Sequence, residues 1–115
     1  MKVISIKENH IFRRLYAKGK SAASPCLAIY CRRNGRDHSR LGITVSAKLG
    51  KAVRRNKIRR RIREIYRIRQ GDLLPGWDIV VVARVKAAHS SYAAIEHSFL
   101  KAADKLGLLR KEPRQ

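Results

Sequence analysis

The 115 residues suffice for one domain with a modest core, and an apolar fraction of 44% is typical of a folded chain and not of a disordered one. The formal net charge of +20, with a pI of about 11.3, would destabilise a compact fold by self-repulsion unless a polyanion neutralises it, which favours nucleic acid over an anionic membrane as the partner. No apolar run approaches the roughly 20 residues that span a bilayer, and the first ten residues are too polar for a signal-peptide core, so we expect a cytoplasmic protein.

The first predicted element is a helix over residues 10–18. Asn9 can cap its N-terminus, and Gly19 fits its C-terminal end. Aromatic residues at helical spacing usually face a core, so the residues alone favour a core role for the aromatic pair on this helix. The helix carries two adjacent i,i+4 pairs, which are Ile11 with Leu15 and Phe12 with Tyr16.

Two strands are predicted next. A turn over 21–25 leads into a strand over 26–33, and a second strand covers 40–46. The loop NGRDHS between them begins with Asn34-Gly35, which favours a hairpin, although this loop is longer than the two-residue turns that the signal usually marks.

Cys26 and Cys31 are five residues apart in the first of these strands, so their side chains should point to opposite faces. We therefore expect two small buried residues in a reducing cytosol and no disulfide. The four histidines show no metal-ligand spacing with each other or with the cysteines.

The segment SAKLGKAVRRNKIRRRIREIYR, residues 46–67, holds ten basic residues and one acid, Glu64. A disordered tail would lack an apolar stripe, and a solvated helix face usually mixes both signs of charge. Arginine in particular suits phosphate, because a guanidinium can donate two hydrogen bonds to it and stack on a base. The segment therefore favours an anion-binding helix over both alternatives. Its predicted core-facing stripe recurs at i, i+4, i+7 and i+8 and consists of Ile58, Ile62, Ile65 and Tyr66.

Two further elements follow the basic helix. GDLLPGW, residues 71–77, is predicted to be a loop, and DIVVVAR, residues 78–84, a strand buried on both faces. The order α-β-β-α-β-α predicts an α+β sandwich that forms a single domain over residues 1–115.

The last helix is predicted over residues 91–106. Ser90 or Ser91 can cap it, Gly107 can end it, and the tail from about residue 109 is expected to fray. Its apolar stripe consists of Ile95, Phe99, Ala102, Ala103 and Leu106.

The acids argue against an active site within this chain. A metal-dependent nuclease needs carboxylates that converge on one or two cations, and here the eight acids are scattered without a close pair. We therefore expect no catalytic residue and no dedicated metal site in the protein.

The order of residues in the basic segment resembles the signature of the bacterial ribonuclease P protein subunit. That family carries the pattern Ser-x-Lys-x-Gly-x-Ala-Val-x-Arg-Asn-x-x-x-Arg. The matching residues are Ser46, Lys48, Gly50, Ala52, Val53, Arg55, Asn56 and Arg60, with Arg63 one turn further on. NHIFRRLYAKG resembles the first helix of the family, and LAIY, LGITVS and DIVVVAR occur where its strands occur.

Three positions depart from the family pattern. Lys57 stands where the family usually has arginine, which keeps the charge and loses the two-pronged donor. Ala47 stands where a second lysine is frequent, and Val85-Lys86 replaces a basic residue followed by proline.

The resemblance implies a fold like domain 2 of ribosomal protein S5, with a central mixed β-sheet, three flanking helices and a left-handed βαβ crossover through the basic helix. General handedness rules alone would favour a right-handed crossover. It also implies a role as the protein subunit of ribonuclease P, which removes the 5′ leader of precursor tRNA. In that family the large RNA subunit hydrolyses the substrate with bound Mg²⁺, and the protein contacts the catalytic RNA, holds the leader and helps retain metal ions.

The resemblance assigns two groups of RNA-binding residues. The leader cleft would be formed by Phe12, Tyr16, Tyr30, Ser46 and Lys48. The contacts to the catalytic RNA would come from Lys51, Arg55, Asn56, Lys57, Arg59, Arg60, Arg63 and Arg84. For Asn56 two roles stay open, a capping hydrogen bond or contact with a metal-bound water.

The resemblance implies neither a protein partner nor a membrane. A structural ribosomal or nucleoid protein is the alternative, because both kinds of protein are small and basic.

Overall fold

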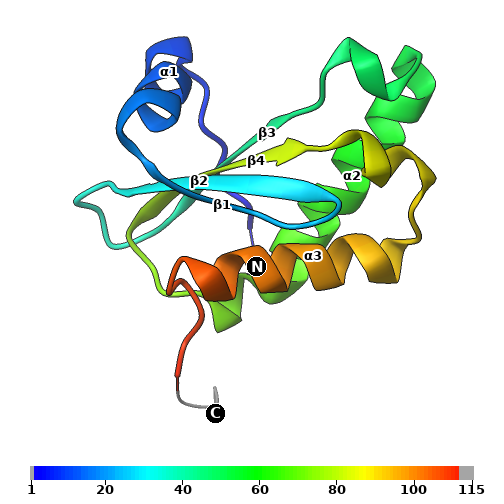
Figure 1. Cartoon of the computed structure of the whole chain (residues 1–115). Coiled ribbons are helices and arrows are strands. Elements are labelled where there is room, and N and C mark those ends of the chain that lie inside the picture. The colour runs from blue at the N-terminus through cyan, green and yellow to red at the C-terminus, as the bar shows by residue number, and fades with distance from the viewer. Residues whose placement is uncertain (1, 112–115) are drawn as a thin grey trace.

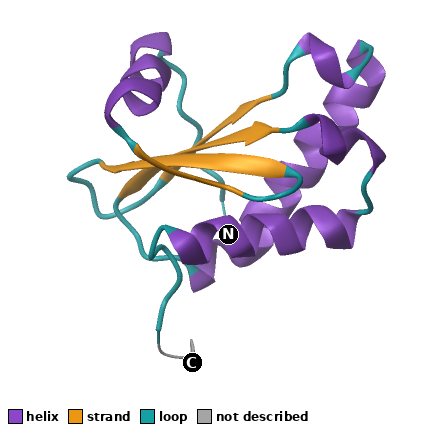
Figure 2. Ribbon diagram, viewed as in Figure 1, coloured by secondary structure: helices purple, strands orange, loops and turns teal. Residues whose placement is uncertain are grey.

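The computed structural model describes residues 2–111, which form one four-stranded sheet and three α-helices. This is the predicted α+β class, with a central mixed sheet flanked by three helices (Figure 2). Three short 3₁₀ segments connect these elements, η1 (Ala47–Leu49), η2 (Gln70–Asp72) and η3 (Val85–His89). The helices and strands are α1 (Asn9–Lys18), β1 (Lys20–Ala23), β2 (Leu27–Arg33), β3 (Arg40–Thr44), α2 (Ala52–Arg69), β4 (Trp77–Ala83) and α3 (Tyr92–Lys105).

The strand order is β1-β2-β4-β3, so β4 lies between the two strands that the hairpin signal was expected to pair. β4 runs antiparallel to β2 and parallel to β3. The hairpin prediction was therefore wrong, although Gly35 does turn the chain with a φ of 71°. The physical reason is that Ile79, Val80 and Val81 of β4 are fully buried, so this strand takes the central position with a neighbour on each side.

The predicted turn over residues 21–25 was wrong in its first half. Lys20–Ala23 forms β1, an edge strand that pairs antiparallel with β2. The turn itself is tighter and lies between Ser24 and Leu27, where the backbone N–H of Ser24 donates to Leu27 O at 2.8 Å. Most residues of β1 are exposed, so no apolar alternation marked it as a strand. The observed order is therefore α-β-β-β-α-β-α.

Different helices cover the two faces of the sheet (Figure 1). α2 and α3 pack on one face and build the main core, and α1 lies over the other face with a smaller apolar cluster around Leu15 and Val80. The predicted stripe of α2 is confirmed, because its four members are all buried. On α3 four of the five predicted stripe residues are buried, while Leu106 is half-buried.

The helix ends follow the sequence signals in part. Ser91 caps α3 by accepting the backbone N–H of Ala94 at 3.1 Å, and Gly107 follows the helix with a φ of 72°. Asn9 is not a cap, because it is already the first residue of α1 and the preceding Glu8 makes no capping hydrogen bond.

The tail does not fray where it was expected to. Leu109 forms a β-bridge with Leu73, and the backbone N–H of Arg110 donates to Asp72 O at 2.9 Å. These contacts tie the chain after α3 to the loop after α2. Residues 112–115 of the predicted tail lie outside the described residues.

Both cysteines are buried as free thiols in one core cluster, so the expected opposite orientation was wrong. Cys26 precedes β2, and its sulfur lies 3.3 Å from Ser90 Oγ. Burial raises the pKa of the Cys31 thiol, which opposes formation of the reactive thiolate. Across residues 2–111, no helix has both the length and the apolar character that a membrane span requires.

Candidate nucleic-acid interface

α2 has one face for the core and one for a ligand. Ile58, Ile62 and Ile65 are buried against the sheet and α3, and this fixes the orientation of the arginines between them. Exposed positions alternate with the stripe along the whole helix and carry most of the predicted contacts to catalytic RNA. They include Asn56, Lys57, Arg59, Arg60 and Arg63.

Several arginines of α2 are held by protein oxygens. Arg59 donates to Ile43 O at 2.9 Å, and Arg63 donates to Ser5 Oγ at 3.2 Å. Arg67 pairs with Glu64, and this hydrogen bond lowers the pKa of the Glu64 carboxyl. These contacts orient the guanidinium groups and leave further N–H donors on Arg59 and Arg63.

Other cations of α2 have no protein partner among residues 2–111. The side chains of Arg60 and Lys57 are exposed and make no hydrogen bond or ion pair with that part of the chain. The Nε of Arg55 is buried without a hydrogen-bond partner. The amide of Asn56 is exposed and makes no capping hydrogen bond there, because the N-cap position is Lys51, five residues earlier.

The start of α2 leaves backbone donors open. Lys51 occupies the N-cap position with extended backbone angles and supplies no side-chain acceptor. The first N–H groups of the helix therefore have no side-chain cap, and uncapped N–H groups at a helix N-terminus favour an anion. Gly50 precedes it with a φ of 123°, a conformation in which an L side chain is strained.

An aromatic surface lies on the α1 side of the sheet. The rings of Tyr16 and Tyr30 meet edge to face with centroids 5.1 Å apart, and the Tyr16 hydroxyl lies 2.8 Å from Thr44 Oγ1. Tyr16 is 42% exposed, whereas Phe12 and Tyr30 are half-buried against the small cluster under α1. The core role that the residues alone favoured therefore fits Phe12, which packs on the small cluster, and not Tyr16, which faces outward. The leader-binding role of both residues stays a prediction.

One cavity joins the aromatic surface to the basic helix. Its volume is about 280 Å³, and Phe12, Arg59 and Arg63 line it together with the edge strand β3 and residues 5–6. Sequence resemblance had assigned Phe12 to the leader and the two arginines to the catalytic RNA. The fold places them around one space, so a single nucleotide could contact all three.

The remaining predicted residues lie at the far end of the sheet. β3 and β4 are parallel, with Thr44 opposite Val82, so the chain leaves both strands at the same end of the sheet, where Ser46 and Arg84 follow. Ser46 and Lys48 flank η1 and are exposed. Arg84 is partly occupied, because its Nη1 donates to Ser24 O at 3.0 Å.

Two residues of this surface have no counterpart in the sequence prediction. A Cβ on Gly42 would lie 2.5 Å from Phe12 Cζ, so only glycine lets the ring rest directly on β3. Thr44 holds the Tyr16 hydroxyl. A glycine inside a strand is a general signal of close approach and would have identified Gly42, whereas nothing in the sequence distinguishes Thr44.

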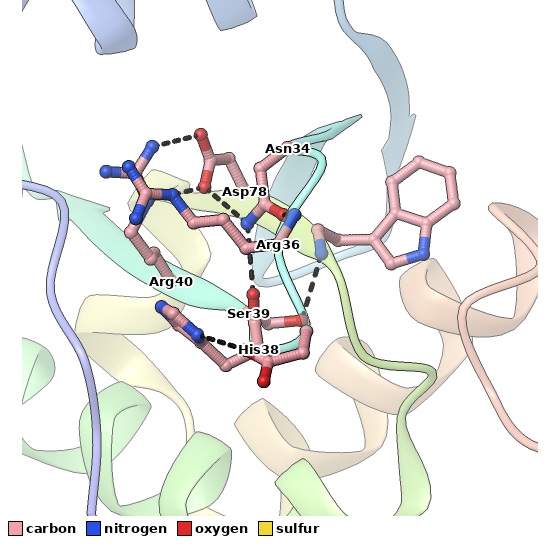
Figure 3. Close-up of polar contacts among 8 residues, drawn as sticks. Asn34, Arg36, His38, Ser39, Arg40 and Asp78 are labelled. Atoms are coloured by element: carbon pink, nitrogen blue, oxygen red, sulfur yellow. Dashed lines mark hydrogen bonds and ion pairs between the residues drawn. The ribbon is translucent and has the colours of Figure 1, made fainter.

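A buried ion pair organises the opposite end of the sheet (Figure 3). Arg40 donates to both oxygens of Asp78 at 2.8 and 2.7 Å, and Asn34 donates to Oδ1 at 3.0 Å. Burial opposes ionisation of Asp78, but the hydrogen bonds from Arg40 and Asn34 outweigh it and hold the pKa of the carboxyl below its usual range. The pair connects β3, β4 and the loop over 34–39.

Most carboxylates of the described chain bind cationic side chains, and none binds another carboxylate. Asp78, Glu64 and Glu96 pair with arginines, and Asp37 contacts His38. Within residues 2–111 no three metal-binding side chains come together. This donor set does not fit a catalytic metal centre, because such a centre needs converging carboxylates that are not already neutralised.

The fold and the site define a small basic α+β protein with a surface suited to a polyanion. The family model described as Ribonuclease P matches residues 1–107. The chain therefore belongs to the ribonuclease P protein family.

Similar proteins support the same assignment. The chain is 44% identical over 94 residues to the ribonuclease P protein component of Clostridioides difficile, covering 81% of this chain and 82% of that protein. It is 39% identical over 110 residues to that of Alkaliphilus oremlandii, covering 95% and 96%. Among solved structures, the RNase P protein of Staphylococcus aureus has a TM-score of 0.86 at 39% identity over 95% of this chain and 100% of that one. The RNase P protein of Thermotoga maritima has a TM-score of 0.78 at 36% identity, covering 84% and 92%.

Proposed function

We propose that the chain is the protein subunit of a bacterial ribonuclease P, acts in the cytoplasm, and assists Mg²⁺-dependent removal of the 5′ leader from precursor tRNA. The observation that carries the proposal is the cavity shared by Phe12, Arg59 and Arg63 in a chain of this family. Stacking and phosphate contacts are the two features with which proteins hold single-stranded RNA. The proposed partners are the catalytic RNA and the precursor leader, without a protein partner or a membrane.

In this proposal the aromatic surface binds the leader. A base stacked on an aromatic ring contributes roughly 1–3 kcal/mol, and such stacking tolerates any base. Tyr16 offers the most exposed ring, and Tyr30 supports it edge-on. Phe12 stacks a base in the adjoining cavity, while Ser46 and Lys48, which follow β3, contact the sugar-phosphate backbone of the leader.

The basic face of α2 binds the catalytic RNA. Arg60 and Lys57 have exposed side chains for phosphate, and Asn56 adds a neutral amide between cations. Arg59 and Arg63 lie at the boundary of the two surfaces because they line the cavity that contains Phe12. Lys51 and Arg55 flank the open N-terminus of the helix, and Arg84 extends the surface at the end of the central strand β4.

Mg²⁺ belongs mainly to the RNA subunit in this proposal. Asp78, Glu64 and Glu96 each pair with an arginine, and within residues 2–111 no three metal-binding side chains come together to hold the ion. Its contribution is to neutralise phosphate and orient the leader, which favours cleavage at low magnesium concentration.

Reconstitution tests the proposal. The protein is mixed with a bacterial ribonuclease P RNA at low magnesium, and leader removal from precursor tRNA is followed. We expect the mixture to cleave faster than the RNA alone and the RNA-free protein to cleave nothing. A protein that neither binds this RNA nor accelerates cleavage would overturn the proposal.

Two variants separate the surfaces in the same assay. Phe12→Ala should weaken binding of precursor tRNA more than of mature tRNA, because only the precursor carries a leader. Arg60→Ala should weaken assembly with the catalytic RNA. Equal effects of Phe12→Ala on both tRNAs would contradict the leader assignment.

A further inference from the structure

A second basic cavity lies on a different side of α1 from Phe12 and Tyr16. Its volume is about 200 Å³, and α1, the end of β2 and the loop over 34–39 enclose it. Arg14 lies two residues from both Phe12 and Tyr16, which is about 200° around a helix, so α1 separates this cavity from the aromatic surface. The cavity contributes nothing to the two surfaces described above. Its charged lining residues are Arg14, Arg32, Arg33, Arg36, Arg40 and Asp78.

The register of the sheet explains why these charges meet. Arg32 of β2 and Arg40 of β3 are the two direct neighbours of Asp78 on β4, so the three side chains form one row on the α1 face. Arg14 approaches the row from the helix. Arg36 reaches it from the loop, where its backbone N–H donates to Asn34 Oδ1 at 2.9 Å.

Only part of this charge is neutralised. Asp78 is bound by Arg40, and the guanidinium of Arg33 lies 5.6 Å from the centroid of the Trp77 ring. Glu8 is close enough to help raise the pKa of Arg40, after the hydrogen bond to Asp78. Within residues 2–111 the side chains of Arg14, Arg32 and Arg36 have neither a hydrogen bond nor an ion pair.

Arg14, Arg32 and Arg36 are exposed, and their guanidinium groups repel each other across one cavity, so an anion that they share would relieve this repulsion. Arginine matches the geometry of phosphate with paired N–H donors. The buried pair of Arg40 and Asp78 forms the bottom of the cavity. Because Arg40 is held by Asp78, the donors that remain for a ligand belong to the other arginines.

We propose that this cavity, here named the Arg14 pocket, binds a backbone phosphate of RNA separately from the aromatic surface and the basic face of α2. The inference rests on the proposed function, which supplies RNA as the polyanion. The phosphate can come from the catalytic RNA or from a leader long enough to pass around α1, and the two sources share the same phosphodiester chemistry.

Binding to RNA tests the Arg14 pocket with a matched control. Arg14→Gln, Arg32→Gln and the double variant each remove charge from the pocket. Arg13→Gln removes the same charge from the adjacent exposed position on α1, outside the pocket lining. Affinity is measured against salt concentration for a bacterial ribonuclease P RNA alone, and with that RNA bound for precursor tRNAs with short and long leaders. Circular dichroism verifies that each variant is folded.

We expect each pocket variant to weaken binding roughly tenfold relative to Arg13→Gln, as removal of a charge-assisted hydrogen bond does. The salt slope should fall by about one for each pocket arginine that is replaced. Weaker binding to the catalytic RNA alone identifies that RNA as the source, and weaker binding confined to long leaders identifies the leader.

Pocket variants that bind every RNA as Arg13→Gln does would overturn the Arg14 pocket and leave the proposed function intact. Wild-type protein that binds none of these RNAs would instead overturn the proposed function. Tighter binding by Arg32→Gln would also contradict the pocket, because it would show that the arginine opposes RNA.

Discussion

At the scale of single residues, the position of Phe12 depends on a missing side chain. Gly42 lies directly beneath its ring, and a Cβ there would meet Cζ and Cε1 at 2.5 and 2.6 Å. Because Phe12 also lines the cavity with Arg59 and Arg63, the glycine determines where a stacked base can lie. The function of an aromatic residue here thus depends on a residue of another element.

Gly42→Ala should destabilise the protein by about 1–2 kcal/mol, because the added methyl group forces the ring away from β3. Phe12→Leu in the same chain should remove most of that cost, since the smaller side chain leaves room for the methyl group. Urea unfolding of both single variants and the double variant measures the coupling. Effects that simply add would show that the ring and the glycine are independent.

At the scale of elements, the ion pair of Arg40 and Asp78 connects two strands and a loop. Asp78 is 7% exposed at the start of the central strand, and Arg40 starts the edge strand beside it. Asn34 connects the loop over 34–39 to this pair, because its side-chain amide donates to both Asp78 and the carbonyl of His38. β2 and β3 do not pair with each other, so this network of side chains connects the loop between them to β4.

Asp78→Asn should lower the free energy of unfolding at pH 7 by about 2–3 kcal/mol, because Arg40 loses its buried partner. The folded-state pKa of Asp78 is depressed, so its contribution is complete above the unfolded pKa of roughly 3.9 and is lost as pH falls through the folded value. The stability curves of wild type and variant should therefore converge below about pH 4.

Urea unfolding between pH 7 and pH 2 measures this convergence, with Asp104→Asn as the control because Asp104 is exposed on α3. A constant difference between wild type and Asp78→Asn down to pH 2 would mean that the carboxylate charge is not what stabilises the fold.

At the scale of the whole molecule, repulsion acts across the entire fold. The chain carries a net charge of +20 within extents of 36 × 32 × 24 Å. At 0.01 M ionic strength the screening length is about 30 Å, so nearly every charge acts on every other. Stability at low salt therefore depends on bound anions, which bring opposite charge to the folded state.

Sulfate should raise the thermal midpoint at low salt, and more than chloride does at equal ionic strength, because binding adds to screening. Circular dichroism at increasing temperature measures both salts, and comparison at constant ionic strength separates the two effects. Identical midpoints and spectra in sulfate and chloride would contradict folding linked to anion binding.

Local patterns in the sequence were enough for most elements. The stripe of Ile58, Ile62 and Ile65 predicted α2, and the apolar run 79–81 predicted a strand buried on both faces. The order of residues around Arg55 and Asn56 indicated the family, which the comparisons confirm. These features depend on spacing along one segment, and such spacing is fully present in the sequence.

Only the tertiary structure decided which segments meet. The hairpin signal at Asn34-Gly35 described a real turn, but the pairing of β2 depended on competition with β4, whose buried residues gain more from the central position. The cavity of Phe12 and Arg59, and the pocket around Arg14, each combine residues from separate elements. Long-range register and burial bring such residues together, and no local pattern carries that information.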